Sequence, residues 1–349
     1  MAAKRQIDVG GVKIGGGADI SVQTMTNTDT GDVAATLRQI HLAADLGCDL
    51  IRVSCPTPAS TKALKDIVRD SPIPVIADIH FNFKRALEAI EAGAACVRIN
   101  PGNTPEHGIR EIVAAAKARG VAIRLGINAG SLARDILEKY GEPTVDAIVE
   151  CAVLNCQKLE ALDFRNFKVS VKSSDVRQSI AAYRKLSRLV DYPLHLGITE
   201  AGTLFPGTIK SAIGIGSLLA DGIGDTLRVS LSGDITEEVR VGRQILKSLN
   251  LLKNTVDIVS CPTCARTLID VVGISKALEE YCENVHKKLK ISVLGCVVNG
   301  IGEARGADIG VFGFQKGVAK LFVRGKEERS MPEEEVLPAV KELIQKMEG

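Results

Sequence analysis

The first 250 residues alternate short apolar runs with longer amphipathic stretches. Most of the runs are rich in Val and Ile, as expected for strands that are buried on both faces of a sheet. The runs cover residues 20–25, 50–55, 74–81, 95–101, 122–128, 167–173, 194–200 and 225–232. The stretches between them predict helices at 33–47, 60–70, 83–93, 108–120, 144–162, 174–191 and 208–222.

Eight strand–helix units in succession predict a closed (β/α)8 barrel, a TIM-like fold of the α/β class. Several of the predicted helices end at a glycine in the C-cap position, namely Gly47, Gly93, Gly120 and Gly222. A doubly wound open sheet is the alternative, but such sheets rarely repeat the unit eight times at this spacing. The glycine run at 15–17 is expected to form a turn in an N-terminal hairpin, after the apolar segment 7–14.

Polar residues stand two positions apart near the ends of seven predicted strands. Because side chains alternate along a strand, these residues share one face, and the Val and Ile between them take the other. The outward face of a barrel strand packs on helices, so we expect the polar face to line the mouth of the barrel, where catalytic residues of such barrels lie. The candidates are Arg52, Asp78, His80, Arg98, Asn100, Arg124, Asn128, Lys172, Glu200, Arg228 and Ser230.

Five of these candidates are cations, and among them only Asp78 and Glu200 can offset the charge. Uncompensated cations in a partly buried cleft are costly unless an anion fills it. We therefore infer a substrate with several negative charges, and two phosphates fit well because guanidinium groups bind phosphate oxygens bidentately. Glu200 is out of step with the alternation, and both a hydrogen-bonding role and a general-acid role remain open for it.

Composition narrows the class of protein. The 349 residues are 45% hydrophobic and 25% charged, with a net charge of +2, so the overall charge gives no indication of a nucleic acid or a membrane as partner. Aromatic residues make up only 3%, which argues against base-stacking surfaces. The N-terminal residues lack the apolar core of a signal peptide, and we expect a cytoplasmic protein. Its nine cysteines then indicate thiols and metal ligands rather than disulfides.

A polar patch at 249–255 marks the predicted boundary between two domains. We expect a substrate-binding barrel domain over residues 1–250 and a small α+β domain over residues 256–349. The predicted strands of the second domain are 256–260, 290–294, 307–312 and 319–323, and its predicted helices are 267–288 and 332–347.

Three cysteines of the second domain lie in two predicted turns. Cys261 and Cys264 form a C-x2-C pair after one strand, and Cys296 follows the next, so neighbouring strands would bring the turns together. Three thiolates with one weak or open position favour a reactive iron–sulfur centre. Structural zinc is the alternative and would need Cys282 or His286 as a fourth ligand. The remaining cysteines are expected to be small buried apolar residues, at Cys48, Cys55, Cys96, Cys151 and Cys156.

Segments along nearly the whole chain resemble the 4-hydroxy-3-methylbut-2-enyl diphosphate synthase family of the methylerythritol phosphate route, in its compact two-domain bacterial form. The matching segments are VQTMTNTDT, PVIADIHF, VRINPGN, RLGINAGSL, KVSVKSSD, LHLGITEAG, GIGDTLRVSLSGD, CPTCAR and GCVVNGIGEARGADIG. The tail after Lys326 carries no such motif.

The resemblance implies an oxidoreductase of isoprenoid biosynthesis. It would open the ring of 2-C-methyl-D-erythritol 2,4-cyclodiphosphate and expel a hydroxyl group as water, giving 4-hydroxy-3-methylbut-2-enyl diphosphate. Two electrons would pass through a 4Fe-4S cluster reloaded by reduced ferredoxin or flavodoxin. The resemblance assigns Cys261, Cys264, Cys296 and Glu303 as cluster ligands, with Glu303 also catalytic. It also implies a head-to-tail homodimer in which each cluster domain caps the other subunit's barrel.

Within the barrel, the resemblance assigns substrate binding to Arg52, Arg98, Asn100, Arg124, Asn128, Lys172, Arg228 and Ser230. It assigns catalytic roles to Asp78, His80 and Glu200, with Glu200 as the favoured proton donor.

Two other functions compete with this hypothesis. One is a pterin- or phosphate-binding barrel transferase of the dihydropteroate synthase kind, and the three-cysteine domain argues against it. The other is an iron–sulfur carrier or redox sensor, and the cations at the strand ends argue against it.

Overall fold

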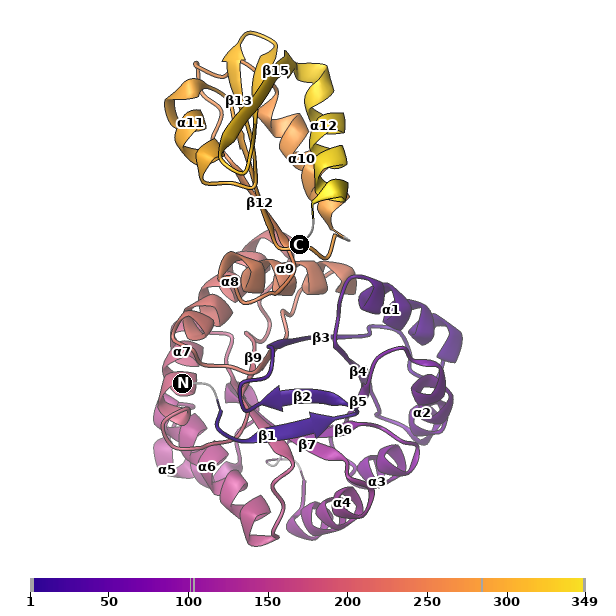
Figure 1. Ribbon diagram of the computed structural model, residues 1–349. Helices are drawn as coiled ribbons and strands as arrows, with labels where there is room; N and C mark the ends of the chain where they lie inside the picture. Colours follow the sequence, from indigo (N-terminus) through magenta and orange to yellow (C-terminus); the bar gives the residue numbers. More distant parts are fainter. Residues whose placement is uncertain (1–2, 101, 103, 284, 348–349) are drawn as a thin grey trace. The chain divides into compact units, whose positions relative to one another are not determined.

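The computed structural model describes residues 3–100, 102, 104–283 and 285–347, and the chain divides into two compact units, Met1–Leu251 and Leu252–Gly349 (Figure 1). The first unit is a parallel barrel with the strand order β8-β7-β6-β5-β4-β3-β10-β9. A parallel bridge between Val169 and Leu194 connects the two end strands. The structure thus confirms the predicted (β/α)8 fold.

The barrel strands lie close to their predicted positions. They are β3 (Ser21–Met25), β4 (Leu50–Ser54), β5 (Val75–Asp78), β6 (Cys96–Ile99), β7 (Ala122–Asn128), β8 (Phe167–Lys172), β9 (His195–Leu196) and β10 (Thr226–Leu227). The outer helices are α1 (Val33–Asp45), α2 (Pro58–Asp70), α3 (Lys84–Glu91), α4 (Glu106–Arg119), α6 (Val145–Ala161), α7 (Val176–Leu186), α8 (Leu204–Ala220) and α9 (Ile235–Ser248). A short helix that the sequence did not predict, α5 (Arg134–Tyr140), follows the 3-10 turn η1 (Ala129–Ser131) between β7 and α6.

Local sequence explains why the helices begin and end where they do. The side chains of five cap residues accept a hydrogen bond from a backbone N–H in the first turn, which satisfies a donor that has no partner within the helix. These caps are Asp32, Thr57, Thr144, Asp175 and Asp234. At the other end of α4, Gly120 has φ of 69°, a left-handed conformation that glycine adopts without steric cost.

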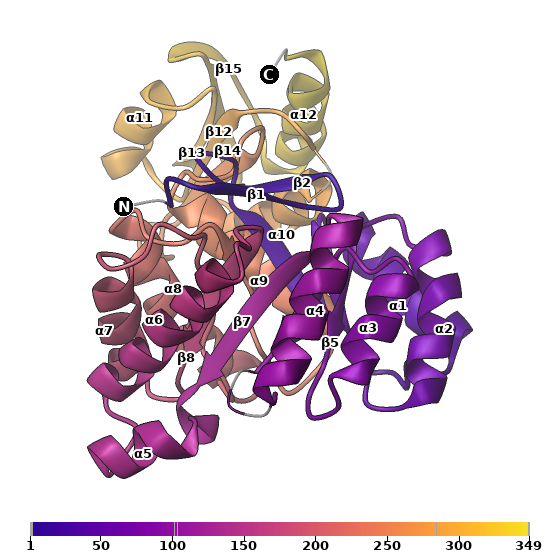
Figure 2. The same ribbon diagram turned by 90° about the horizontal axis from the view of Figure 1, so that it is seen from below.

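An N-terminal hairpin closes the barrel at the end where the strands begin (Figure 2). It consists of β1 (Gln6–Val9) and β2 (Val12–Gly15), and its turn is at Gly10 and Gly11, both with positive φ, rather than at 15–17 as predicted. The hairpin buries apolar side chains against the first residues of four barrel strands. This cluster contains Ile7, Val9, Ile14, Leu50, Ile76, Cys96 and Ala122.

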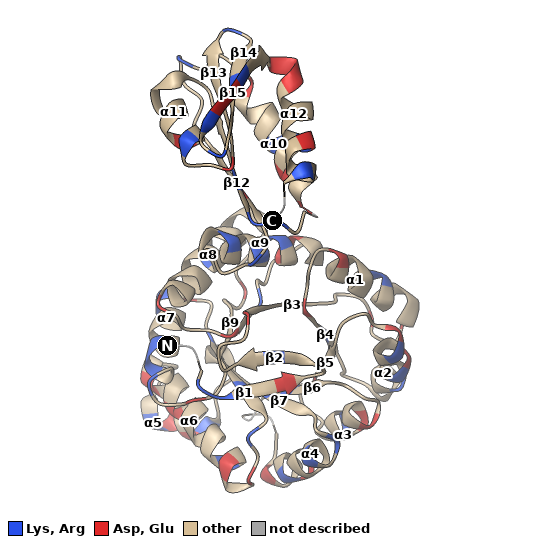
Figure 3. Cartoon of the chain, in the orientation of Figure 1, with Lys and Arg blue, Asp and Glu red and all other residues tan. Residues whose placement is uncertain are grey.

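The outer surface carries charges of both signs over the helices of the barrel (Figure 3), in line with the small net charge. Within the described part of the chain, no helix is both long and apolar enough to cross a membrane.

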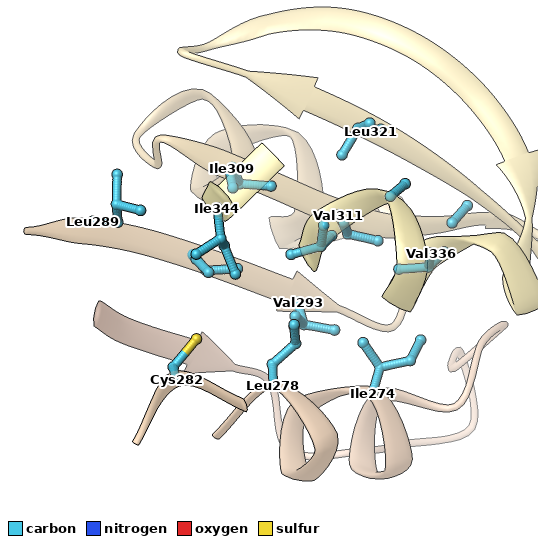
Figure 4. Close-up of a cluster of buried hydrophobic side chains, with 14 of the residues drawn as sticks. Ile274, Leu278, Cys282, Leu289, Val293, Ile309, Val311, Leu321, Val336 and Ile344 are labelled. Carbon is cyan, nitrogen blue, oxygen red and sulfur yellow. The ribbon is translucent and has the colours of Figure 1, made fainter. Parts of the chain in front are cut away.

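The second unit is a five-stranded sheet with helices on both faces. Its strands are β11 (Val256–Ser260), β12 (Leu289–Leu294), β13 (Ile309–Gln315), β14 (Val318–Val323) and β15 (Lys326–Pro332). The first three are parallel, and β14 and β15 are antiparallel to their neighbours. Helices α10 (Val271–Cys282) and α12 (Glu333–Lys346) cover one face and enclose the main apolar core (Figure 4). Helix α11 (Val297–Arg305) packs on the other face around Phe312 and Phe322.

Three elements of this unit, α10, α11 and β15, differ from the sequence-based predictions. Helix α10 ends at Cys282 instead of 288, and Lys287 donates hydrogen bonds to the carbonyl groups that end α12, at Ile344 (2.8 Å) and Met347 (2.7 Å). The chain therefore crosses to α12 and caps it instead of extending α10. Strand β15 was missed because its sequence, KEERSMP, has little apolar alternation.

Candidate active site and candidate metal centre

A pocket of about 270 Å³ opens at the carboxyl ends of the barrel strands. Its lining comes from the six strands β3 to β8 and from the segments that follow β5, β9 and β10. The alternation of polar and apolar positions turns the polar side chains inward. The lining residues are Met25, Arg52, Asp78, His80, Arg98, Arg124, Asn128, Ser170, Lys172, Thr199, Arg228 and Ser230. All five predicted cations are thus brought together in one pocket.

Two glycines in the strands make room for these long side chains. A Cβ atom at Gly126 would lie 2.4 Å from Nε of Arg98, and one at Gly197 would lie 2.6 Å from Nζ of Lys172. A Cβ atom does not approach non-bonded atoms this closely, so a larger residue at either position would displace a cation and, at Gly197, also the carbonyl oxygen of Arg228. The glycines in RLGIN and LHLGIT are therefore explained by space for Arg98 and Lys172.

Asp78 is the carboxylate around which one side of the pocket is organised. It is buried, and its oxygens lie 3.2 Å from Nη1 of Arg98, 3.6 Å from Nε of Arg52 and 3.8 Å from Nε2 of His80. Burial by itself would raise the pKa of Asp78, but the charges of Arg52 and Arg98 outweigh burial and hold this pKa well below its usual range. Asp78 is therefore an ionised anchor for two cations.

A second carboxylate, Glu238, lies on the other side and was missed by the sequence analysis. It is on α9, outside the pocket lining, and binds Arg228 through two hydrogen bonds of 3.1 Å. Met25 was also missed: its sulfur accepts hydrogen bonds from Nε and Nη2 of Arg52, at 3.1 and 2.9 Å. The thioether orients Arg52 and, being neutral, leaves its charge uncancelled.

The excess of positive charge is reflected in the ionisation of the cations. Burial, and then the neighbouring arginines, lower the pKa of Lys172 well below its usual range. Burial lowers the pKa of Arg124 to about 10, with Arg98 as the next contribution. Among the described residues, the carboxylates paired with these five cations are Asp78 and Glu238, so the pocket has an excess of three positive charges when all are ionised. Such a pocket is suited to a multiply charged anion.

A further polar layer lies deeper in the barrel, toward the hairpin. Lys168, in register with Arg124, and His195 are fully buried, and Lys168 Nζ and His195 Nε2 have no hydrogen-bond partner among the described residues. Burial lowers the pKa of Lys168 to about 8, and it lowers the pKa of His195 well below its usual range. The alternation that predicts Ser170 and Lys172 as inward residues also includes Lys168, two positions earlier.

Two predicted barrel residues lie outside the pocket lining. Asn100 uses its side chain between two loops, donating to Oγ of Ser131 in the turn after β7 at 3.0 Å and accepting from the N–H of Gly102 in its own loop at 3.1 Å. Glu200 is exposed after β9, with φ of 53°. A left-handed backbone is uncommon for a residue other than glycine, so Glu200 marks a sharp turn of the chain.

Three of the four cysteines of the second unit follow the carboxyl ends of two strands of its sheet. Cys261 follows β11 and Cys296 follows β12, and these two strands are parallel neighbours, as the sequence analysis expected. The backbone N–H of Gly295, which precedes Cys296, donates to the sulfur of Cys261 at 3.2 Å. Cys264 is exposed, and its N–H donates to Oγ1 of Thr267. The two cysteine-bearing loops therefore meet.

Glu303 is on helix α11, where the sequence analysis expected a turn. The helix was hidden by its glycines, yet Gly300 serves packing, because a Cβ atom there would lie 2.5 Å from that of Phe312. Cys296 is the N-cap of this helix, and Glu303, seven residues on, is on the same face about 10 Å along the axis. Helical side chains lean toward the N-terminus, so Glu303 leans toward Cys296. Its carboxylate lies 3.7 Å from Nζ of Lys290.

In the part of the chain that the structure describes, no three His, Cys, Asp or Glu side chains stand close enough together to hold a metal ion. The donor set nevertheless fits an iron–sulfur centre in chemistry and position. Its thiols lie on adjacent loops, the N–H of Gly295 bonds to a sulfur, and the positive end of a helix dipole faces Cys296.

The zinc alternative loses both of its extra ligands. Cys282 packs in the apolar core between α10 and α12 (Figure 4), and His286 is exposed beyond the end of α10. The five cysteines of the barrel unit are all buried, as predicted: Cys48, Cys55, Cys96, Cys151 and Cys156.

The barrel with its cation-rich pocket and the small unit with its cysteine loops define a two-part TIM-barrel enzyme that acts on an anion. Residues 4–243 match the family model described as the GcpE TIM-barrel domain, and residues 257–346 match the GcpE protein C-terminal domain.

Two curated relatives carry the name 4-hydroxy-3-methylbut-2-en-1-yl diphosphate synthase (flavodoxin). The protein of Zymomonas mobilis is 56% identical over 98% of this chain and 91% of its own length. The protein of Geobacter sulfurreducens is 52% identical over 99% of both. The chain belongs to the GcpE family of 4-hydroxy-3-methylbut-2-en-1-yl diphosphate synthases, which are oxidoreductases, as the sequence motifs predicted.

Among solved structures, dihydropteroate synthase from Stenotrophomonas maltophilia is similar, with a TM-score of 0.52 and 14% identity over 70% of this chain and 98% of that one. This similarity concerns the barrel fold alone and gives no support to the transferase hypothesis.

Proposed function

We propose that this chain reduces 2-C-methyl-D-erythritol 2,4-cyclodiphosphate to 4-hydroxy-3-methylbut-2-enyl diphosphate and water, as an oxidoreductase of isoprenoid biosynthesis. The observation that carries the proposal is the accumulation of five cations in one small pocket of a barrel whose relatives bear the name of this synthase. A cyclic diphosphate supplies the missing negative charge in a compact form.

Substrate binding is the role of the cations and of two neutral residues. Arg52, Arg98, Arg124, Lys172 and Arg228 bind the phosphate oxygens, and Asn128 and Ser230 complete the hydrogen bonding. Asn100 is proposed to support this pocket by connecting the loop after β6 to Ser131 in the turn after β7. The cations repel one another in the ligand-free pocket, and the phosphates relieve this repulsion. The relief contributes to the free energy of substrate binding.

The second unit is proposed to hold a 4Fe-4S cluster on Cys261, Cys264, Cys296 and Glu303. When bound, the cluster supplies electrons one at a time to the bound substrate. Glu303 would exchange its contact with Lys290 for the cluster. The domain roles follow: residues 1–250 bind the substrate and residues 256–349 bind the cluster.

Proton delivery to the departing hydroxyl group requires an acid that the cations of the pocket do not hold in its ionised form. Asp78 is unsuitable as a donor, because its pKa lies well below the usual range, and it positions Arg52 and Arg98 instead. Glu200 is the proposed donor to the departing hydroxyl group, from its turn after β9. His80, beside Asp78 and partly exposed, is proposed to hydrogen-bond the substrate at the pocket entrance.

The proposed electron donor is reduced flavodoxin, which the names of the relatives support, with ferredoxin as the second candidate. We further propose a head-to-tail homodimer in the cytoplasm. The absence of any disulfide among the described residues is consistent with a reducing compartment. Exposed apolar side chains on α8, including Phe205 and Ile213, offer a surface that a second copy could cover.

The proposal is tested on the full chain purified without oxygen. Iron, acid-labile sulfide and the electron paramagnetic resonance of the reduced protein are measured, and turnover of the cyclic diphosphate is followed with chemically reduced flavodoxin. We expect about four irons per chain and formation of the linear diphosphate. A colourless protein that binds zinc and does not consume the cyclic diphosphate would contradict the proposal.

A further inference from the structure

Glu238 is a buried carboxylate whose two oxygens accept four hydrogen bonds. It lies in the first turn of α9 and is 3% exposed. Its oxygen Oε2 accepts from Nε of Arg228 at 3.1 Å and from Oγ1 of Thr24 at 2.6 Å. Its oxygen Oε1 accepts from Nη2 of Arg228 at 3.1 Å and from the N–H of Leu231 at 2.9 Å. This leaves Glu238 with a fully used hydrogen-bonding shell.

The two bonds to Arg228 lock one edge of its guanidinium group. Nε and Nη2 both face Glu238, which is the bidentate arrangement that fixes the plane of the group. The third nitrogen, Nη1, lies 3.8 Å from the sulfur of Met25, another residue of the pocket lining. Glu238 thus fixes the orientation of Arg228 and leaves Nη1 as the nitrogen that does not face the carboxylate.

The same carboxylate also binds the backbone of one segment beside the pocket and a side chain of the neighbouring strand. Leu231 follows Ser230, so the hydrogen bond from its N–H holds the peptide that carries Ser230. Thr24 precedes Met25 on β3, the strand that pairs with β10. Three neighbouring parts of the lining therefore depend on one side chain that does not itself line the pocket.

We propose that Glu238 is a positioning residue for the diphosphate, acting through Arg228 and Ser230. This inference rests on the proposed function, in which those two residues bind the substrate. Glu238 partly neutralises the charge of Arg228, but it also fixes the orientation of the guanidinium group. An arginine held in one plane loses little conformational entropy when it binds phosphate. Glu238 is not among the residues that line the pocket, so it acts through its neighbours.

Glu238→Gln tests the proposal in the cluster-loaded full chain. A glutamine keeps the volume but turns an amide N–H₂ toward donors, so at least one bond to Arg228 is lost. We expect the KM for the cyclic diphosphate to rise about tenfold, with kcat within about threefold of the parent. Glu238→Asp keeps the charge and should recover part of the loss. The matched control is Glu237→Gln, the preceding residue, which pairs with Arg240 and should leave KM unchanged.

A double-mutant cycle with Arg228→Lys separates positioning from general structural support. If Glu238 acts through Arg228, adding Glu238→Gln to Arg228→Lys should lower kcat/KM by less than about twofold further. Independent, multiplying losses, or a Gln variant with unchanged KM, would overturn the proposal. If Glu238→Gln does not fold, as judged by its melting temperature, Glu238→Asp carries the same cycle. A parent enzyme that neither binds nor turns over the cyclic diphosphate would instead refute the proposed function.

Discussion

The sulfur of Met25 lies 2.9 Å from Nη2 of Arg52, so that a neutral thioether and the carboxylate of Asp78 together orient one guanidinium group. A second carboxylate in the place of Met25 would hold Arg52 as well, but it would also cancel charge that an anionic substrate needs. The contact between Met25 and Arg52 therefore orients the guanidinium group and preserves the positive potential of the pocket.

Met25→Leu should weaken substrate binding without unfolding the protein. Leucine has a similar volume, but it cannot accept a hydrogen bond, so Arg52 is held by Asp78 alone. We expect the KM to rise about three- to tenfold with little change in melting temperature. Steady-state kinetics and thermal unfolding measure both effects. Met331→Leu, a buried methionine of the second unit, is the control, and equal effects of the two substitutions would contradict the role of Met25.

Lys172→Met should separate stability from function. Lys172 is a buried cation among cations, so replacing it with an apolar side chain of similar length should stabilise the ligand-free enzyme. We expect the melting temperature to rise by about 2–4 °C, equivalent to roughly 1 kcal/mol, and the KM to rise tenfold or more. Lys185→Met, at an exposed pair with Asp146, should change neither quantity much. An unchanged KM for Lys172→Met would place Lys172 outside the phosphate site.

The lowered pKa of Lys172 predicts a definite pH dependence. Between this pKa and the ordinary value of 10.5, the folded protein binds fewer protons than the unfolded chain, so the contribution of Lys172 to the free energy of unfolding rises with pH. A bound phosphate favours the charged amine, so substrate binding should take up protons in the same window. Calorimetric titration in buffers with different ionisation enthalpies measures this uptake, which should be smaller in Lys172→Met. An equal or larger uptake by that variant would contradict the assignment.

Glu303→Ala should affect turnover more than cluster content. A carboxylate binds iron less tightly than a thiolate does, so three cysteines should still retain much of the iron after the change. We expect most of the turnover to be lost and the electron paramagnetic resonance spectrum of the reduced protein to change. Glu279→Ala, on the exposed side of α10, is the control. A normal rate together with an unchanged spectrum would remove Glu303 from the cluster and from the mechanism.

The barrel and most of its pocket could be predicted because each rests on a pattern within a single segment. Arg124 and Asn128 alternate with buried Ile and Leu along β7, and this spacing is sufficient to aim them inward. Strand β11 was predicted with its observed bounds for the same reason. Such alternation also points to Lys168, which the sequence analysis did not pursue.

The residues that the sequence did not reveal either contact distant segments of the chain or have the appearance of ordinary packing residues. Glu238 lies in an amphipathic helix, where a carboxylate normally faces water, and only the packing of α9 on β3 brings it to Arg228. Met25 looks like an ordinary apolar strand residue, because the sequence does not reveal that its sulfur meets two guanidinium groups. Helix α11 was missed because Gly300, required by contact with Phe312, lowers the helical propensity of the segment.

The hairpin at the amino-terminal end of the barrel closes the interior at that end. Ile7, Val9 and Ile14 cover that end with apolar side chains, so among the described residues the pocket opens past the strand ends that carry the cations. We expect the water released in the proposed reaction to leave past the same strand ends at which the diphosphate enters. Because substrate and product use the same opening, a new substrate cannot enter until the previous product has left.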